Sequence, residues 1–466
     1  MPHYNLLSKL VPVLVAVLLI AACSKDPQPP PVPTGPVTQK ETNSWILDSM
    51  RYFYLWNSTL PAKVDTQPGA VAYFNLLKNK DDRFSIIYDP NDLATYPKYM
   101  LYNYGIDFSI INWPQAPGGA IAVIKLVLPG SVAGLNGIKR GDYFTRINGT
   151  PISSSNATTL STAMLQEGSV SLTLATVNNN TVTEDNSLTL QAGRFGEDPV
   201  YAQKVLVVNG KKAGYLFYNS FNDAYNSSVM SILQNFKDAG INELILDLRY
   251  NPGGSVAASS LITALIAPNI NEQSGFVRYS GNNNLGQRTI SFKSALSVPE
   301  TGAPVSFSTL APTRLSLSRV FILAGAQTAS AAELLINNLK PYTQVILIGQ
   351  KTFGKDKGAV IIRDARTPQR IPWILMPISY NLANVKGEGG YTQGLTPQYQ
   401  VDELAKQPLL PIGDEHDPLI AKVVDILNGN GRQAAPQSLV SPRVYFDTRT
   451  QQAAGSIVSL PASLFR

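Results

Sequence analysis

The sequence predicts a multidomain α+β protein, because three stretches of the chain follow different hydrophobic patterns. Residues 41–100 carry aromatic and aliphatic side chains at helical spacing, which predicts a small N-terminal helical domain. From about residue 104 to 192 the pattern changes to short strands separated by glycines, which predicts a β domain. Residues 199–430 alternate apolar strands with helical stretches, which is typical of an α/β domain with a parallel sheet.

Composition excludes several classes of protein. The 466 residues are 44% hydrophobic and 15% charged, which is typical of globular domains, and the chain is long enough for several cores. The net charge is +6, but the 38 basic residues form no long Lys/Arg run, so we expect no nucleic-acid partner. One cysteine and two histidines allow no internal disulfide and make a Cys/His metal site hard to build, so we expect no metal and no other cofactor.

The amino terminus predicts export and lipid anchoring. Residues 1–22 combine Lys9 with an apolar run too short to span a bilayer of about 30 Å comfortably, which indicates a secretory signal peptide. The run ends in Ile-Ala-Ala-Cys, which resembles a bacterial lipobox and implies a lipoprotein of the cell envelope, anchored in the membrane through lipidated Cys23. Ser24 stands where an Asp would resemble an inner-membrane retention signal, so we expect the outer membrane, facing the periplasm or the cell surface. The alternative is a plain signal peptide with a chance cysteine. Residues 23–40 are rich in proline and predict an extended linker.

The helical domain at 41–100 contains two predicted helices. The apolar residues between 45 and 56 recur at helical spacing, and residues 70–78 predict the second helix. We interpret the aromatic stripe of the first helix as core packing, and not as a ligand site.

The β domain, at residues 101–193, carries two pieces with a recognisable pattern. The segment LPGSVAGLNGIKRGDYFTRINGTPI, at 128–152, resembles the PDZ module, with a short helix at 131–135 and the hairpin signal Asn-Gly. The resemblance implies that YGIDF is the carboxylate-binding loop and the following strand, whose edge would add a peptide as an extra strand. Asp107 stands where the module usually has a small or apolar residue, and it adds a negative charge near an anion site. The expected peptide-binding residues are Tyr104, Gly105, Ile106, Asp107 and Phe108.

The α/β region contains a strand, helix, strand unit at 321–355. An apolar strand is followed by a small-residue turn with Ser330, a helix, a second apolar strand and a loop that ends in Lys355. A crossover connection makes the two strands parallel, so both residues should lie beyond the carboxyl ends of their strands. This is the sheet edge where α/β proteins place their chemistry, and we expect the two residues to be neighbours. Upstream, residues 213–221 and 243–254 are expected as strands, with a helix at 223–239 between them.

A lysine is the base that the sequence offers to Ser330. His416, in GDEHDP, is the candidate histidine of the mature chain for a Ser-His-Asp triad, and it reads as part of a solvated loop. Lysine accepts a proton near neutral pH only if burial or a nearby cation such as Lys357 lowers its pKa from about 10.4. The start of the helix after Ser330 favours a developing anion, and the N–H groups of Ala331 and of a Gly253-Gly254 turn could form an oxyanion hole. The alternative is that Ser330 only caps its helix.

Several motifs together resemble one family. They are TASAAE at 328–333, TFGK at 352–355, LDLRYNPGG at 246–254 and the PDZ-like module upstream, in that order along the chain. The resemblance is to the carboxy-terminal processing peptidases, or tail-specific proteases, which are serine peptidases with a Ser-Lys dyad.

The resemblance implies a catalytic domain of the α/β crotonase/ClpP-like type at 199–430, acting on protein or peptide substrates with free C-termini. It implies that Ser330 is the nucleophile, that Lys355 is the general base, and that the oxyanion donors are Gly253 or Gly254 with Ala331. Many members have Gln four residues after the lysine, whereas this chain has Ala359, and Glu333 matches a family acid interpreted as structural.

Two other hypotheses remain at this stage. One is a catalytically weak or inactive homologue that binds peptides through its PDZ-like module, and the other is an envelope scaffold or carbohydrate-binding protein. Residues 431–466 are expected to form a loosely attached tail.

Overall fold

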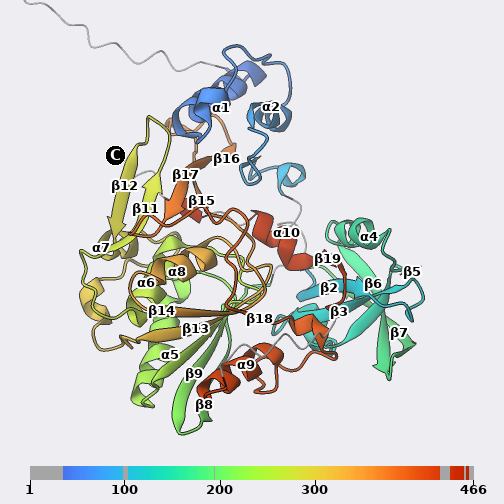
Figure 1. Cartoon of the computed structure of the whole chain (residues 1–466). Helices are drawn as coiled ribbons and strands as arrows, with labels where there is room; N and C mark the ends of the chain where they lie inside the picture. Colours follow the sequence, from blue (N-terminus) through green and yellow to red (C-terminus); the bar gives the residue numbers. More distant parts are fainter. Residues whose placement is uncertain (1–34, 98–102, 194, 431–440, 456–457, 461–466) are drawn as a thin grey trace, which may run out of the picture. The chain divides into compact units, whose positions relative to one another are not determined.

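The structure is a computed structural model that describes residues 35–97, 103–193, 195–430, 441–455 and 458–460 (Figure 1). The chain divides into two compact units, Met1–Thr38 and Gln39–Arg466, and the fold below is that of the second unit. The predicted signal peptide, Cys23 and most of the predicted linker lie outside the described residues. Within the described ranges, no helix is long and apolar enough to cross a membrane.

The N-terminal region is helical, as predicted. Its helices are α1 (Gln39–Phe53) and α2 (Ala70–Leu77), which pack on one another through buried Ile46, Met50 and Tyr73. The first helix ends before Tyr54, whose side chain enters the same core. A short strand, β1 (Ile86–Tyr88), pairs antiparallel with β16 (Ile374–Met376) and joins this region to the α/β part of the chain. The remaining short elements are the 3-10 helices η1 (Asn57–Thr59) and η2 (Leu93–Thr95).

The predicted β domain forms a sheet in the order β19-β2-β3-β4-β6-β7, with β5 paired to β4. Its elements are β2 (Ile106–Asn112), β3 (Ala120–Val127), α3 (Val132–Leu135), β4 (Tyr143–Ile147), β5 (Thr150–Pro151), α4 (Ala157–Met164), β6 (Ser169–Asn178), β7 (Thr181–Gln191) and β19 (Val444–Asp447). The predicted Asn-Gly hairpin is confirmed, because Asn148 and Gly149 join β4 to β5 with φ of 49° and 77°. Positive φ at both central residues is the requirement of a tight hairpin turn.

The expectation of a loosely attached tail at 431–466 is wrong for the part that the structure describes. Strand β19 pairs antiparallel with β2, and α10 (Thr448–Gly455) contacts β2 as well. Phe446 is buried in the core of this sheet, and its ring lies 5.8 Å from that of Phe108. The sequence prediction failed because a four-residue strand carries little periodic signal, and its partner is distant along the chain.

The α/β region is built on a sheet in the order β18-β14-β13-β10-β9-β8. The strands are β8 (Val200–Val208), β9 (Lys211–Tyr218), β10 (Glu243–Asp247), β13 (Arg319–Ala324), β14 (Gln344–Gly349) and β18 (Tyr399–Gln400). Pairing is parallel throughout except for the β8–β9 hairpin. The predicted parallel pair flanking Ser330 is confirmed, since β13 and β14 run side by side in parallel.

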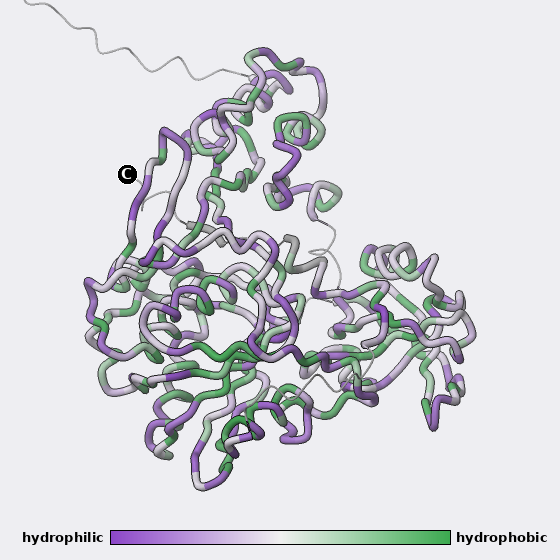
Figure 2. Tube along the Cα trace, in the orientation of Figure 1, coloured by the Kyte–Doolittle hydropathy of each residue, from purple (hydrophilic) through white to green (hydrophobic). Residues whose placement is uncertain are grey.

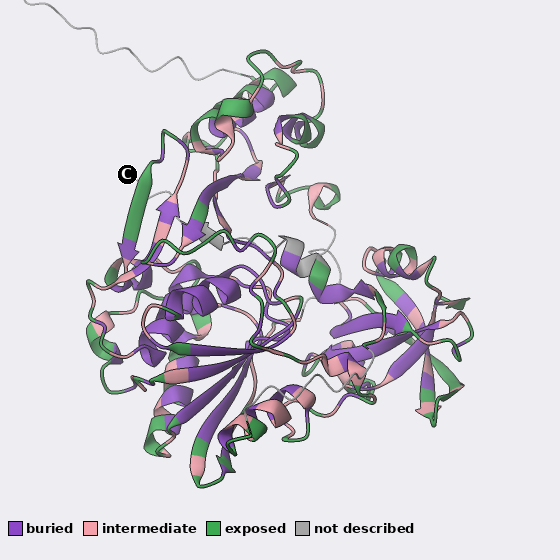
Figure 3. Ribbon diagram, in the orientation of Figure 1, coloured by how far each residue is buried: buried purple, intermediate pink, exposed green. Residues whose placement is uncertain are grey.

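Helices cover both faces of this sheet. The helices are η4 (Asp223–Tyr225), α5 (Asn226–Asp238), α6 (Val256–Ile266), α8 (Ala331–Leu339) and α9 (Pro418–Leu427). Alternate residues of β10 point to opposite faces: Leu246 packs in the cluster with α5, α6 and α8, whereas Ile245 packs with α9. Hydrophobic residues gather along the central strands in Figure 2, and Figure 3 shows the same strands buried.

A further sheet has the strand order β12-β11-β17-β15-β20 (Figure 1). Its strands are β11 (Gly275–Ser280), β12 (Gln287–Ser291), β15 (Lys357–Val360), β17 (Ile378–Ala383) and β20 (Val458–Leu460). The remaining short helices are α7 (Phe292–Leu296), η5 (Phe307–Leu310) and η6 (Glu403–Ala405).

A buried ion network fixes the end of β10. The Arg249 guanidinium is 1% exposed and donates to Asp247 at 2.7 Å and to Asp417 at 2.8 Å. Glu403 accepts from Arg249 at 3.1 Å and also from Arg140 of the β domain at 3.0 Å. Buried charges persist only when each has partners of this quality, so the network joins the β domain to the sheet that leads to the NPGG turn.

We expect Arg249→Met to lower the free energy of unfolding by about 3–5 kcal/mol, because it leaves buried carboxylates without a partner. The matched control is Lys293→Met, which breaks a surface pair with Glu272 whose side chains are 60% and 43% exposed. That change should cost less than about 1 kcal/mol. Urea unfolding followed by circular dichroism measures both, and equal losses would contradict the structural role of the network.

Candidate active site

Ser330 lies in a strained turn between β13 and α8. Its backbone has φ 58° and ψ −118°, a region that side chains other than glycine rarely adopt. The turn is held by Ala329, whose N–H donates to the Asn251 carbonyl at 3.0 Å, and by Thr328, whose hydroxyl donates to the Leu248 carbonyl at 2.7 Å. A strained residue on a strand, turn, helix junction is the arrangement that exposes a nucleophile in several hydrolases.

The NPGG turn lies against this serine. A Cβ atom on Gly253 would lie 2.6 Å from the Ser330 Cβ and 2.8 Å from the Ala331 nitrogen, and one on Gly254 would lie 2.2 Å from the Phe221 carbonyl oxygen. Both glycines also have positive φ, so no other residue fits this close approach. The structure thus brings the expected oxyanion donors Gly253 and Ala331 beside Ser330. The N–H of Gly253 donates to the Asn251 side chain at 2.8 Å in this conformation.

Lys355 is buried against an aromatic ring, with charged groups of both signs nearby. Its side chain is 0% exposed, and Nζ lies 4.7 Å from the centroid of the Phe84 ring. Burial lowers the pKa of Lys355 to about 7; the nearby Glu333 opposes this shift and Arg83 adds to it. The repelling cation is therefore Arg83, and not Lys357 as the sequence suggested. Lys357 instead donates to the Asp356 side chain at 3.0 Å.

Glu333 ties the two segments together. Its buried carboxylate accepts hydrogen bonds from the backbone N–H of Ser330 at 3.1 Å, of Gly354 at 2.7 Å and of Lys355 at 2.7 Å. It also accepts from the Thr352 hydroxyl at 2.5 Å. The sequence indicates a structural role for Glu333, and the Ser-x-x-Glu spacing of a capping box predicts its contact with Ser330. Its contacts with the lysine loop carry no sequence signal.

Glu333 holds the backbones of Ser330 and Lys355 near one another, but the two side chains are not hydrogen-bonded to each other. Both are 0% exposed, and neither Ser330 Oγ nor Lys355 Nζ makes a hydrogen bond within the described part of the chain. His416, in contrast, lies at the surface: its side chain is 86% exposed and contacts Asp414. A histidine triad with Ser330 is therefore not formed in this structure.

Position 359, where the resemblance implied a glutamine, is apolar. Ala359 is 0% exposed on β15 and packs in a small cluster with Phe84 and Ile378. No polar side chain reaches Lys355 from this position. Phe84, which the sequence analysis did not single out, supplies the ring above Nζ, and no short motif marks such a contact between distant segments.

The expected peptide-binding residues lie at the start of β2. Tyr104 donates its hydroxyl to the Glu167 carbonyl at 2.6 Å, and the N–H of Gly105 donates to the Asn103 side chain at 2.6 Å. Ile106, Asp107 and Phe108 open strand β2, which has β3 on one side and β19 on the other.

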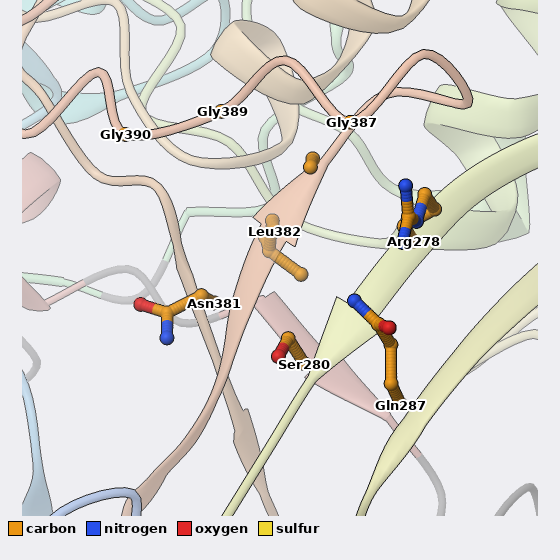
Figure 4. A pocket seen from close by; sticks show the side chains of 9 residues that line it. Arg278, Ser280, Gln287, Asn381, Leu382, Gly387, Gly389 and Gly390 are labelled. Carbon is orange, nitrogen blue, oxygen red and sulfur yellow. The ribbon is translucent and has the colours of Figure 1, made fainter.

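A hollow in the described part of the chain lies apart from the Ser330 site. A cavity of about 310 Å³ lies between β11, β12, β17 and the loop at 387–390, lined by Arg278, Gln287 and Asn381 (Figure 4). None of the expected site residues lines it. Among the residues that the structure describes, no cluster of three or more His, Cys, Asp or Glu residues could hold a metal ion.

Comparison with known proteins identifies the family. The model of peptidase family S41 matches residues 212–364, and that of the S41 N-terminal domain matches residues 41–86. A carboxyl-terminal-processing protease of Picosynechococcus sp. is 30% identical over 242 residues, which are 50% of this chain and 50% of that protein. Carboxyl-terminal-processing peptidase 1 of Arabidopsis thaliana chloroplasts is 24% identical over 285 residues, 60% of this chain and 53% of that protein. Residues 41–86 and 212–364 therefore match the two domains of peptidase family S41, and these matches, with the similarity to carboxyl-terminal-processing peptidases, support that family for this chain.

The S41 assignment agrees with the fold. A crystal structure from Bacteroides fragilis, described as a candidate S41 protease, is 27% identical and superposes with a TM-score of 0.66. It covers 85% of this chain and 99% of its own. The predicted mixed α/β multidomain architecture is therefore that of an S41 protein. The chain spans about half the length of the curated S41 relatives it matches.

Residues of the two matched regions contact each other at Lys355. The match at 212–364 contains Ser330 and Lys355, whereas the N-terminal match at 41–86 contains Phe84. The ring that covers Lys355 thus comes from the region of the other S41 match, and folding of both regions is needed to create the buried environment.

We expect Glu333→Ala to destabilise the S41 protein by several kcal/mol, because it leaves the buried N–H groups of Ser330, Gly354 and Lys355 without an acceptor. Each such group costs about 1–3 kcal/mol. Glu272→Ala is the control, since Glu272 is an exposed acid, and it should change stability little. Thermal unfolding of both variants measures the difference. A Glu333→Ala protein as stable as the control would show that the tether is dispensable.

Proposed function

We propose that this chain is a serine endopeptidase of the cell envelope that cleaves proteins or peptides near their C-termini. Ser330 is the nucleophile and Lys355 the general base. The observation that carries the proposal is a buried lysine with a pKa of about 7 that one carboxylate ties to a serine in a strained turn. A lysine with such a pKa is partly neutral at physiological pH and can accept a proton.

The reaction is acyl transfer. Neutral Lys355 takes the hydroxyl proton as Ser330 Oγ attacks the peptide carbonyl, and the resulting oxyanion is received by the N–H groups of Ala331 and of Gly253 or Gly254. If Gly253 is the donor, the Asn251 side chain must first release its N–H. The protonated lysine returns the proton to the leaving amine, and water then hydrolyses the acyl-enzyme.

Substrate access requires a change from the conformation described above. Ser330 and Lys355 are both completely buried, and Phe84 covers the lysine. Movement of the region that carries Phe84 would open the site and let Ser330 Oγ approach Lys355 Nζ.

The other parts of the chain bind the substrate and anchor the protein to the membrane. A crotonase/ClpP-like catalytic domain spans 199–430, a PDZ-like domain spans 101–193, and lipidated Cys23 anchors the mature chain to the outer membrane. The order of β2, β3, α3, β4, β5, α4 and β6 supports the PDZ-like assignment, because a strand follows the glycine loop and a helix lies between β5 and β6. The second candidate is an inactive homologue that binds peptides, and the apolar Ala359 beside the lysine favours it.

We expect Ser330→Ala and Lys355→Ala each to lower kcat/KM on an unfolded, fluorogenic protein substrate by at least about 1,000-fold. The first change removes the nucleophile and the second removes the general base. Ser260→Ala is the matched control: Ser260 is also 0% exposed with an unpaired hydroxyl, and its variant should keep wild-type activity.

Two results would decide between the candidates. Unchanged activity in Ser330→Ala rules out the dyad. A folded wild-type protein that cleaves no substrate, while still binding peptide, supports the inactive homologue.

The pH dependence of kcat/KM should report the lysine. Because Lys355 must be neutral, kcat/KM should rise with pH through an apparent pKa of about 7, and fall about tenfold for each unit below it. Phe84→Ala admits water, reduces desolvation and should move this limb to higher pH. Phe84→Leu keeps the apolar cover but removes the attraction of the ring for the cation, so its limb should stay at or below pH 7. Identical profiles for the three proteins would show that Phe84 does not set the lysine pKa.

A further inference from the structure

The groove beside β2 is already filled by the chain itself. Strand β19 pairs antiparallel with β2 on the edge away from β3, with Phe446 opposite Ile110 and Asp447 opposite Ser109. The same strand contacts helix α4, so it lies between the strand and the helix (Figure 1). Addition of an extended segment to a sheet edge beside a helix is the β-augmentation mode of peptide recognition.

Buried charges hold the end of β19 in place. Arg449 is 2% exposed, and its Nε donates to Asp107 Oδ2 at 2.6 Å. The Thr448 hydroxyl donates to Asp107 Oδ1 at 2.9 Å and accepts from the N–H of Phe108 at 3.1 Å. Asp107 is the residue that departed from the usual apolar pattern in the sequence. The structure gives this departure a reason, because its carboxylate matches a cation of the C-terminal segment.

A second buried ion pair requires an acid at position 447 of β19. Asp447 accepts from Lys125 Nζ at 2.5 Å and from the Ser109 hydroxyl at 2.5 Å. Lys125 is 1% exposed, so this pair is enclosed on both sides. Truncating one partner of a buried charge pair costs several kcal/mol, which makes the match between groove and segment specific.

A peptide that ends in a free carboxylate at this loop would not form the ion pair that Arg449 forms with Asp107. Such a carboxylate would approach the loop at 104–107, where the Gly105 N–H already donates to Asn103 and where the Asp107 side chain repels an anion. An internal segment that places an arginine there gains an ion pair instead.

We infer that the groove between β2 and α4 is a peptide site whose resident ligand is β19. Its specificity is for an internal Phe-Asp-Thr-Arg segment and not for a free C-terminus. The inference rests on the peptide-binding role proposed above for β2, and it names the occupant of that site. Because β19 belongs to the same chain, its effective concentration is on the order of millimolar, so micromolar peptide does not displace it.

Binding of a labelled peptide tests the inference in the full-length mature protein with Ser330→Ala, so that cleavage has no part in the result. The probe is an amidated, fluorescein-labelled peptide with the sequence RVYFDTRT of residues 443–450, followed by fluorescence anisotropy. The protein with an intact tail should bind this probe weakly. Adding Arg449→Glu places an acid against Asp107, expels β19, and should tighten probe binding at least about 30-fold.

Two further variants separate release of the strand from unfolding. Arg443→Glu makes the same charge change at an exposed residue next to β19, and it should leave binding weak. Arg449 also pairs with Glu197 at 3.1 Å, so the rescue variant combines Asp107→Arg and Glu197→Gln with Arg449→Glu. It restores an ion pair with reversed charges and should restore both the closed groove and the melting temperature. Equal probe binding by all four proteins, or no rescue in the combined variant, would overturn the inference.

A second probe tests the specificity. The peptide RVYF with a free carboxylate ends where β19 continues to Asp447. In the Arg449→Glu protein it should bind at least tenfold more weakly than the amidated RVYFDTRT. Tighter binding of RVYF would identify the groove as a site for free C-termini and refute the preference for an internal segment.

Discussion

The buried carboxylate of Glu333 is the interaction on which the candidate site depends. Ser330 begins a helix after β13, and Lys355 lies in a loop after β14, so parallel pairing alone brings only their backbones to one edge of the sheet. Glu333 accepts N–H groups from both segments and so fixes their relative position. A carboxylate with several donors in a dry interior is costly to move, because each broken hydrogen bond leaves a buried polar group unpaired.

The environment of the lysine comes from parts of the chain that are remote in sequence. Burial lowers the pKa of Lys355 to about 7, and Phe84 of the N-terminal region supplies part of that burial. Ala359, four residues after the lysine, packs in a cluster with Phe84 and Ile378 and has no polar side chain. In this chain the pKa of the lysine is therefore lowered mainly by exclusion of water and further by the charge of Arg83, whereas the charge of Glu333 opposes the shift.

Buried ion pairs link the β domain to its surroundings. Arg140 reaches Glu403 and Tyr250, and Tyr250 directly precedes the NPGG turn beside Ser330. Lys125 pairs with Asp447 of β19 and lies 4.8 Å from the centroid of the Tyr250 ring. The occupied groove and the NPGG turn thus share one aromatic residue, which offers a physical route from one to the other. Charges in such a network are stable only together, since each lone member would remain buried and unpaired.

The sequence by itself determined the architecture, the parallel pair around Ser330 and Lys355, and the elimination of histidine as base. These features follow from local patterns: hydrophobic period, glycine positions and residue counts. The tertiary structure alone decided that Phe84 covers the lysine, that Arg83 and not Lys357 repels it, and that residues 444–449 fill the groove beside β2. Contacts of this kind join residues hundreds of positions apart. They depend on how the folded elements pack, and a local sequence pattern does not predict which distant residues an element will contact.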